Sequence, residues 1–203
     1  MFQTVLSAIY KMPLEQSNFF TVEPIENGPI CELGEGPHWD PKTKILHYVD
    51  AFVGNIHRFN TETKIHDKFN TGTLSSVIIP IDGSDNEFIT TLRNKIVKLN
   101  WENKKIDILA TVPETERFND AKADSNGRLW IGTIKEDSAK NIVPLGGSLY
   151  KLVGNNLVKM SQNYSISNGM AWNKNDTLMF FNDSEDKKTY VFDFDATNGT
   201  ISK

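Results

Sequence analysis

Three short segments place polar side chains in apolar, strand-like surroundings. Glu35 lies in GEGPHWD, Asn119 in RFND and Asn168 in SNGMAW. Carboxylate and amide oxygens suit hard cations such as Ca²⁺ or Mg²⁺, whereas zinc favours nitrogen and sulfur ligands. If these side chains converge in the fold, they predict a site for a divalent cation. The alternative is that the Glu-Gly and Asn-Gly pairs are only turn residues.

Other common signatures of chemistry are missing from the sequence. It contains no G-x-S-x-G elbow, no glycine-rich phosphate loop, no H-E-x-x-H and no EF-hand ligand series. We interpret His38, His47, His57 and His66 as strand and turn surface rather than as a zinc site. Cys31 is the only cysteine, so no disulfide can form within the chain. A reducing compartment fits best, and we expect a cytoplasmic location, with secretion less favoured.

The charge and hydropathy of the chain exclude two kinds of partner. It carries 22 basic and 26 acidic residues, for a net charge of -4, and the basic residues do not cluster. We therefore expect no nucleic-acid partner. No apolar stretch approaches the ~20 residues of a membrane span, so we expect no membrane partner. Residues 1–20 lack the pattern of a signal peptide and are predicted to be a poorly ordered extension of a domain over 21–203.

The positions of the strands explain how the polar segments could meet. Short runs rich in β-branched and aromatic residues recur along the chain, separated by polar turns, and helical periodicity is nearly absent. The expected strands cover Ile45–Val49, Asn55–Phe59, Val77–Ile81, Phe88–Leu92, Ile96–Leu99, Leu129–Thr133, Ser148–Leu152, Leu178–Phe181 and Tyr190–Phe194.

The turns are also periodic. From Asp40 to Asp82 and from Asp82 to Asp124 is 42 residues, and from Asp124 to Asn173 is 49 residues. A period of this length with about four strands in each unit is typical of the blade of a β-propeller. A β-sandwich also has regular strands but does not repeat its internal pattern at this period. The sequence therefore predicts an all-β propeller.

About four such blades fit between Gly34 and Lys203. A lone strand, Thr21–Ile25, is predicted to precede them, as in propellers whose terminal strand completes the last blade. The pattern fits either a four-bladed ring or an arc of a larger one. Glu35, Asn119 and Asn168 each lie where the innermost strand of a unit begins, so we expect them to converge on the central channel.

At these residues the chain resembles a known family. GEGPHWD, RFNDAKADSNGRLWIGT and SISNGMAWN are similar to the motifs of the regucalcin, gluconolactonase and luciferin-regenerating enzyme family. The resemblance runs from about Thr21 to Lys203, in the family's order and spacing. It implies a six-bladed propeller, of which this chain would supply an arc of about four blades.

The resemblance also implies roles for individual residues. Glu35 and Asn168 match the metal ligands of the family, which hold Ca²⁺ or another divalent cation such as Zn²⁺, Mg²⁺ or Mn²⁺. Arg117 and Asn119 match residues that hold substrate hydroxyls and carbonyl. Asp137 lies at a substrate-contacting position where vertebrate members carry Glu, and its shorter side chain puts that contact in question. An alternative for Arg117 is an ion pair with Asp120 or Glu116 across a turn.

The implied activity is metal-dependent hydrolysis of a small lactone. The family's acid/base residue is an aspartate in a P-D-G motif, which has no counterpart in this sequence. We therefore expect no complete catalytic set and impaired catalysis by the 203-residue chain. The alternative function is that of a non-catalytic calcium-binding or partner-binding protein. An open arc would leave the faces of its end blades bare, so we also expect self-association.

Overall fold

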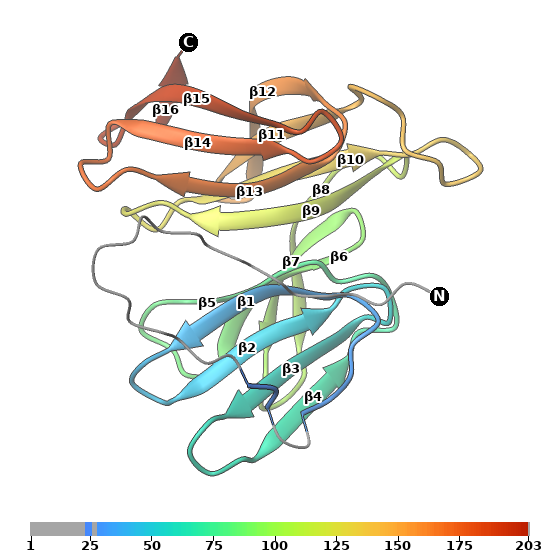
Figure 1. Ribbon diagram of the computed structural model, residues 1–203, viewed down its shortest axis with the longest axis vertical. Helices are drawn as coiled ribbons and strands as arrows, with labels where there is room; N and C mark the ends of the chain where they lie inside the picture. The colour runs from blue at the N-terminus through green and yellow to red at the C-terminus, as the bar shows by residue number, and fades with distance from the viewer. Residues whose placement is uncertain (1–22, 26–27, 203) are drawn as a thin grey trace.

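The computed structural model describes residues 23–25 and 28–202, and these residues form sixteen strands and no helix (Figure 1). The predicted N-terminal extension, residues 1–20, lies outside the described residues. Within the described part, no helix has the length and apolarity that crossing a membrane requires. The fold is therefore all-β, as the strand pattern predicted.

The strands form four antiparallel sheets of four strands, each in chain order from the first strand to the fourth. Each sheet is one propeller blade, so the predicted architecture is confirmed. Blade 1 contains β1 (Gly34–Asp40), β2 (Ile45–Asp50), β3 (Asn55–Asn60) and β4 (His66–Asn70), and blade 2 contains β5 (Ile78–Pro80), β6 (Glu87–Leu92), β7 (Lys95–Asn100) and β8 (Ile106–Thr111). Blade 3 contains β9 (Glu116–Ala123), β10 (Leu129–Lys135), β11 (Gly147–Val153) and β12 (Asn156–Tyr164), and blade 4 contains β13 (Ser167–Trp172), β14 (Leu178–Asp183), β15 (Lys188–Asp195) and β16 (Thr200–Ser202).

A recurring turn explains part of the sequence period. Between the third and fourth strands of blades 1, 2 and 4, a side-chain oxygen accepts hydrogen bonds from the backbone N–H groups two and three residues later. The residue four positions after that side chain has a positive φ, which closes the turn. The paired positions are Asn60 and Lys64, Asn100 and Lys104, and Asp195 and Gly199.

Three apolar clusters fill the spaces between successive blades. Full burial of one large apolar side chain is worth about 1.5–3 kcal/mol, so these clusters hold the blades against one another. The fully buried members include Val49, Ile56 and Leu99 between blades 1 and 2, Ile96, Phe118 and Ile131 between blades 2 and 3, and Trp130, Met179 and Phe181 between blades 3 and 4.

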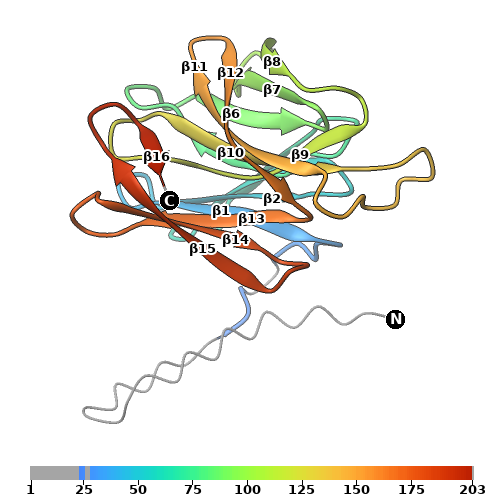
Figure 2. The ribbon, with the colours of Figure 1, turned by 90° about the horizontal axis from the view of Figure 1, so that it is seen from above.

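The first strand of each blade lies toward the middle of the molecule. β1 packs beside β5, and β9 packs beside β13 (Figure 1). Seen from above, β1, β9 and β13 lie toward the centre, whereas β7, β8, β11 and β12 lie at the periphery (Figure 2). The predicted strand over Thr21–Ile25 is not found where it can be examined: residues 23–25 belong to no strand, and residues 21 and 22 lie outside the described part.

Candidate metal and substrate site

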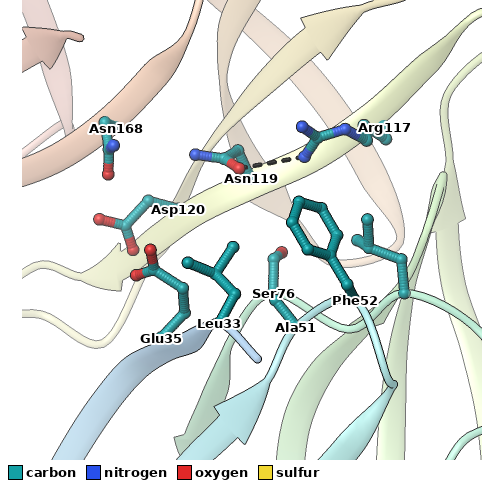
Figure 3. Close-up of a pocket in the computed structure, with 10 residues that line it drawn as sticks. Leu33, Glu35, Ala51, Phe52, Ser76, Arg117, Asn119, Asp120 and Asn168 are labelled. Carbon is teal, nitrogen blue, oxygen red and sulfur yellow. Dashed lines mark hydrogen bonds between the residues drawn. The ribbon is translucent and has the colours of Figure 1, made fainter. Parts of the chain in front are cut away.

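A cavity of about 50 Å³ lies where the innermost strands of the blades approach one another (Figure 3). Such a volume holds an ion with a few waters. The structure brings Glu35, Arg117, Asn119 and Asn168 together around it, from β1, β9 and β13. The remaining lining residues are Leu33, Ala51, Phe52, Leu74, Ser76 and Asp120.

Local irregularities in the strands direct these side chains into the cavity. The register of β1 shifts beside Glu35, that of β9 shifts at Asn119 and Asp120, and that of β13 shifts at Asn168. A β-bulge of this kind bends a strand and changes the direction of its side chains. Each of the three strands that carry polar site residues is the first strand of its blade, and each has a register shift beside or at its site residue.

A glycine makes the first of these irregularities possible. Gly36 has a φ of +54°, a conformation that L side chains rarely adopt. A Cβ at this position would lie 3.2 Å from both the carbonyl oxygen of Ser76 and the Cα of Val77. The G-E-G sequence therefore places Glu35 on a backbone that can turn toward the cavity and approach blade 2 closely.

Two carboxylates face each other across the cavity. Figure 3 shows the carboxylates of Glu35 and Asp120 directed toward one another. Burial raises the pKa of Glu35, and the negative charge of Asp120 raises it further. Burial also raises the pKa of Asp120, against the opposing effects of the Ala121 backbone N–H and Lys122. The pair is a concentration of partly desolvated negative charge, which a cation would stabilise.

The sequence interpretation did not include Asp120 among the site residues. Asp120 follows Asn119 directly, and in a regular strand the two side chains would point to opposite faces. The bulge in β9 removes that alternation, and both residues line the cavity. The adjacent polar residues in RFND were the only local indication of this. They place two side chains at the cavity only because the bulge makes both point to the same face.

The two amides are held by hydrogen bonds. Asn168 donates from Nδ2 to Ser184 Oγ at 2.8 Å, and its Oδ1 accepts from the N–H of Gly169 at 3.0 Å. Asn119 donates from Nδ2 to the carbonyl oxygen of Ser167 at 2.8 Å. These contacts fix the amide of Asn168 in an orientation in which Oδ1 retains a lone pair for another partner.

Arg117 has a different partner from those suggested by the sequence. Its Nε donates to Oε1 of Glu136 at 2.8 Å, and its Nη1 donates to Oδ1 of Asn119 at 3.1 Å. Arg117 does form an ion pair, but with Glu136, so the expected alternative partners Asp120 and Glu116 are wrong. Glu136 belongs to the segment after β10, which packs back onto the start of β9 by a hydrogen bond from its N–H to a backbone carbonyl.

Asp137, the neighbour of Glu136, does not line the cavity. It is exposed and accepts hydrogen bonds from Nδ2 of Asn141 at 3.0 Å and from the N–H of Ala139 at 2.8 Å. The bond from Asn141 is the main reason that the pKa of Asp137 is lowered. Its side chain thus stabilises a turn at a distance from the four residues that the cavity gathers.

The histidines lie away from the cavity, and two of them are not surface residues as predicted. His47 and His57 are each only 3% exposed. Burial and the positive charge of Arg58 lower the pKa of His47 to about 4. His57 Nδ1 lies 2.8 Å from His66 Nε2, so one ring donates to the other. His47 packs on Phe88 of blade 2, and His57 stacks on Tyr48 and His66 of its own blade, so tertiary packing buries two side chains that were expected at the surface.

The oxygen donors at the cavity fit a hard cation. Glu35, Asp120 and Asn168 offer two carboxylates and one amide oxygen, which suit Ca²⁺, Mg²⁺ or Mn²⁺ better than zinc. Over residues 23–25 and 28–202, no group of three His, Cys, Asp or Glu side chains is arranged to hold a metal. The site is thus a mixed carboxylate and amide site, and Ca²⁺ would complete its 6–8 ligands with water or other oxygens.

The four blades, with an oxygen-lined cavity at their inner strands, place this chain in the class of β-propellers. A family model described as the SMP-30/Gluconolactonase/LRE-like region matches residues 33–203, and the chain belongs to this family.

Individual relatives agree with this assignment. The chain is 31% identical over 174 residues to pentonolactonase XacC of Haloferax volcanii, covering 85% of this chain and 57% of that protein. It is 32% identical over 178 residues to regucalcin of Macaca fascicularis, covering 85% of this chain and 58% of regucalcin. The chain therefore spans somewhat more than half the length of the curated relatives it matches.

Solved structures show the same fold. A luciferin-regenerating enzyme superimposes with a TM-score of 0.79 at 33% identity, over 85% of this chain and 59% of that one. A calcium-binding protein, regucalcin, from Agrobacterium tumefaciens superimposes with a TM-score of 0.76 over 85% of this chain and 58% of that one. The second match, at 20% identity, supports the fold alone.

Proposed function

We propose that this chain forms the metal- and substrate-binding part of a divalent-cation-dependent lactone hydrolase. The observation that carries the proposal is the convergence of carboxylate, amide and guanidinium groups from three blades around one cavity. Relatives named as lactonases from Haloferax volcanii and Bacillus subtilis support the reaction class. The substrate class is a small lactone, with aldonolactones as the first candidates.

The residues of the cavity divide into two functional groups. Glu35, Asp120 and Asn168 would hold the cation, with Ca²⁺ preferred and Zn²⁺, Mg²⁺ or Mn²⁺ as alternatives. When bound, such an ion supplies Lewis-acid polarisation of the lactone carbonyl. Arg117 and Asn119 would orient the ring through its hydroxyl and carbonyl oxygens, since a guanidinium donates several hydrogen bonds in a fixed plane.

Catalysis by residues 1–203 on their own is proposed to be weak. The family resemblance assigns proton transfer to an aspartate in a P-D-G motif, and this sequence contains no such motif. Loss of a general base typically slows a reaction by ~10²–10⁴-fold. The second candidate function, non-catalytic binding of calcium or of a partner, corresponds to cation binding with no lactone hydrolysis at all.

Calorimetry and a lactonase assay on the same preparations test this proposal. We expect Ca²⁺ binding by the wild-type chain, about tenfold or more weaker binding by Glu35→Gln because a charged ligand is lost, and hydrolysis of gluconolactone that stops with a chelator. Glu32→Gln is the matched control, because Glu32 is an exposed carboxylate three residues away and does not line the cavity. Equal Ca²⁺ affinity in wild type and Glu35→Gln would refute the assignment of the metal ligands.

We also propose self-association through the outer face of blade 4. Ala171, Phe180 and Val191 lie side by side in register across three strands of that face, and Val191 is 52% exposed. The opposite face of the blade packs on blade 3. Exposed apolar rows of this kind favour association. Light scattering should show larger particles for wild type than for Val191→Lys, and identical particle sizes would contradict the proposal.

A further inference from the structure

A single buried carboxylate joins two arginines near the cavity. Glu136 is 8% exposed, and its two oxygens have different partners. Oε1 accepts from Nε of Arg117, and Oε2 accepts from Nη2 of Arg93. Both ion pairs are partly enclosed, with Arg117 less exposed than Arg93. Glu136 is therefore shared between blade 3, which carries Arg117, and blade 2, which carries Arg93.

The backbone of Arg93 is fixed at the same place. Arg93 lies in the turn between β6 and β7 with a φ of +52°, which is uncommon for a residue other than glycine. Its N–H donates to the carbonyl of Leu74 at 2.8 Å, and its own carbonyl accepts from the N–H of Phe118 at 2.8 Å. The side chain of Arg93 thus reaches Glu136 from a turn whose backbone is hydrogen bonded to Phe118, the neighbour of Arg117 on β9.

These bonds determine what Arg117 can offer to a ligand. Glu136 occupies its Nε, and Asn119 occupies its Nη1. Asn119 is in turn bonded to the carbonyl of Ser167 on β13. Among the described residues, these bonds leave both N–H groups of Nη2 and one N–H of Nη1 for a further acceptor. The guanidinium is therefore held at two points, in a chain of hydrogen bonds that runs from blade 2 through blade 3 to blade 4.

We propose that Arg93 and Glu136 are positioning residues, which hold the guanidinium of Arg117 in the orientation that receives an oxygen of the substrate. The proposal rests on the substrate-binding role of Arg117 described above. Holding a side chain of many rotamers in one orientation before binding removes part of the entropic cost of binding. A purely structural role would instead make Arg93 and Glu136 an ion pair that joins two blades without affecting the ligand.

The test measures binding of a hydrolysis-resistant aldonolactam by calorimetry in saturating Ca²⁺, for each variant of the full chain. We expect Arg93→Ala and Arg93→Gln to bind the lactam about tenfold more weakly, because Arg117 loses its fixed orientation. Arg93→Lys should restore most of the affinity, since a lysine can still pair with Glu136. The control is Lys98→Ala, which removes a cation bonded to Glu87 at 3.0 Å on the same β6–β7 hairpin; it should bind like wild type.

A second readout reports on Arg117 without a ligand. In the wild type, the Nε–H signal of Arg117 in a ¹⁵N NMR spectrum should be protected from exchange with water, and Arg93→Gln should lose that protection. Melting curves identify variants that do not fold. If Arg93→Ala does not fold, the test rests on the comparison of Arg93→Gln with Arg93→Lys.

Three outcomes are informative in different ways. Weaker lactam binding by Arg93→Gln, with unchanged Ca²⁺ affinity and recovery in Arg93→Lys, supports the positioning role. Wild-type lactam affinity in folded Arg93→Gln overturns this inference and leaves the proposed function standing. Failure of the wild type itself to bind the lactam overturns the proposed substrate site, and the positioning role with it.

Discussion

Glu35 and Asp120 face each other across the cavity, and neither forms a salt bridge within residues 23–25 and 28–202, whereas Glu136 is paired with both Arg93 and Arg117. The pKa values of the first two carboxylates are raised, mainly by burial. Burial also opposes ionisation of Glu136, but hydrogen bonds from Arg117 and Arg93 outweigh it and lower its pKa. Carboxylates of the same protein thus have pKa values that are shifted in opposite directions.

This difference separates two carboxylates whose negative charge is not neutralised by a described residue from one that two arginines neutralise. A facing pair of partly desolvated carboxylates is unfavourable in the absence of an ion and gains most from binding one. A carboxylate that is already paired gains little and instead holds its partners in place. The comparison therefore supports the proposed role of Glu35 and Asp120 in metal binding and the proposed role of Glu136 in the organisation of Arg117.

The largest expected effect comes from removing both unpaired charges. Glu35→Gln combined with Asp120→Asn should lower Ca²⁺ affinity by about 100-fold or more, since charge count sets affinity at oxygen-ligand sites. Isothermal titration calorimetry measures this directly. The control variant is Asp85→Asn with Glu102→Gln, which removes two exposed charges outside the cavity. A similar loss of affinity in the control would mean that net charge, and not ligation, governs binding.

The paired carboxylate should behave in the opposite way. Glu136→Gln should lower the free energy of unfolding by about 2 kcal/mol, because two partly buried arginines lose their counter-ion, and should leave Ca²⁺ affinity nearly unchanged. Denaturant titration gives the first quantity. Glu87→Gln, which breaks the more exposed pair with Lys98, should cost under about 1 kcal/mol. Equal costs for the two variants would remove the distinction between them.

The pH dependence of metal binding sharpens the comparison. A carboxyl group with a raised pKa takes up its proton at a higher pH than usual, and a cation binds only the deprotonated form. Ca²⁺ affinity should therefore begin to fall at a pH above the usual carboxyl range, by about tenfold per pH unit for each proton displaced. The pKa of Glu136 is lowered, so its ion pair with Arg117 should persist over the pH range in which Ca²⁺ affinity falls. Ca²⁺ affinity that stays constant down to the usual carboxyl range would contradict the raised pKa values.

A smaller effect is expected on stability without metal. Asp120→Asn should raise the free energy of unfolding in chelator by about 0.5–1 kcal/mol, because it removes a desolvated charge that repels Glu35. Asp124→Asn should do the reverse, since Asp124 accepts hydrogen bonds from Arg128 and Trp130. Chemical denaturation in chelator distinguishes the signs, and a destabilised Asp120→Asn would show that its charge is already compensated.

The smallest effect is expected for Asp137. Its carboxylate lies in an exposed turn, bonded to Asn141, so Asp137→Ala should change aldonolactam affinity by less than about threefold. A tenfold loss, measured by calorimetry beside Arg117→Ala, would show that this turn closes onto the ligand and that the substrate role proposed from the family resemblance holds.

Several strands were predictable because apolar side chains lie on both of their faces. β6 and β7 pack on both neighbouring blades, and their apolar residues identify them in the sequence. The outermost strands carry little of this signal. β4, with the sequence HDKFN, has four of its five residues exposed, so only its pairing with β3 reveals it as a strand.

The sequence by itself determined the propeller, through its repeated turns, and the chemical types of Glu35, Arg117, Asn119 and Asn168, through motifs that also carry the family resemblance. Only the tertiary structure added Asp120, gave Arg117 the partner Glu136, and buried His47 and His57. The physical reason is that turns and strand alternation are local, whereas a β-bulge reverses the direction of a side chain. The partner that a side chain then meets depends on which blade packs against it.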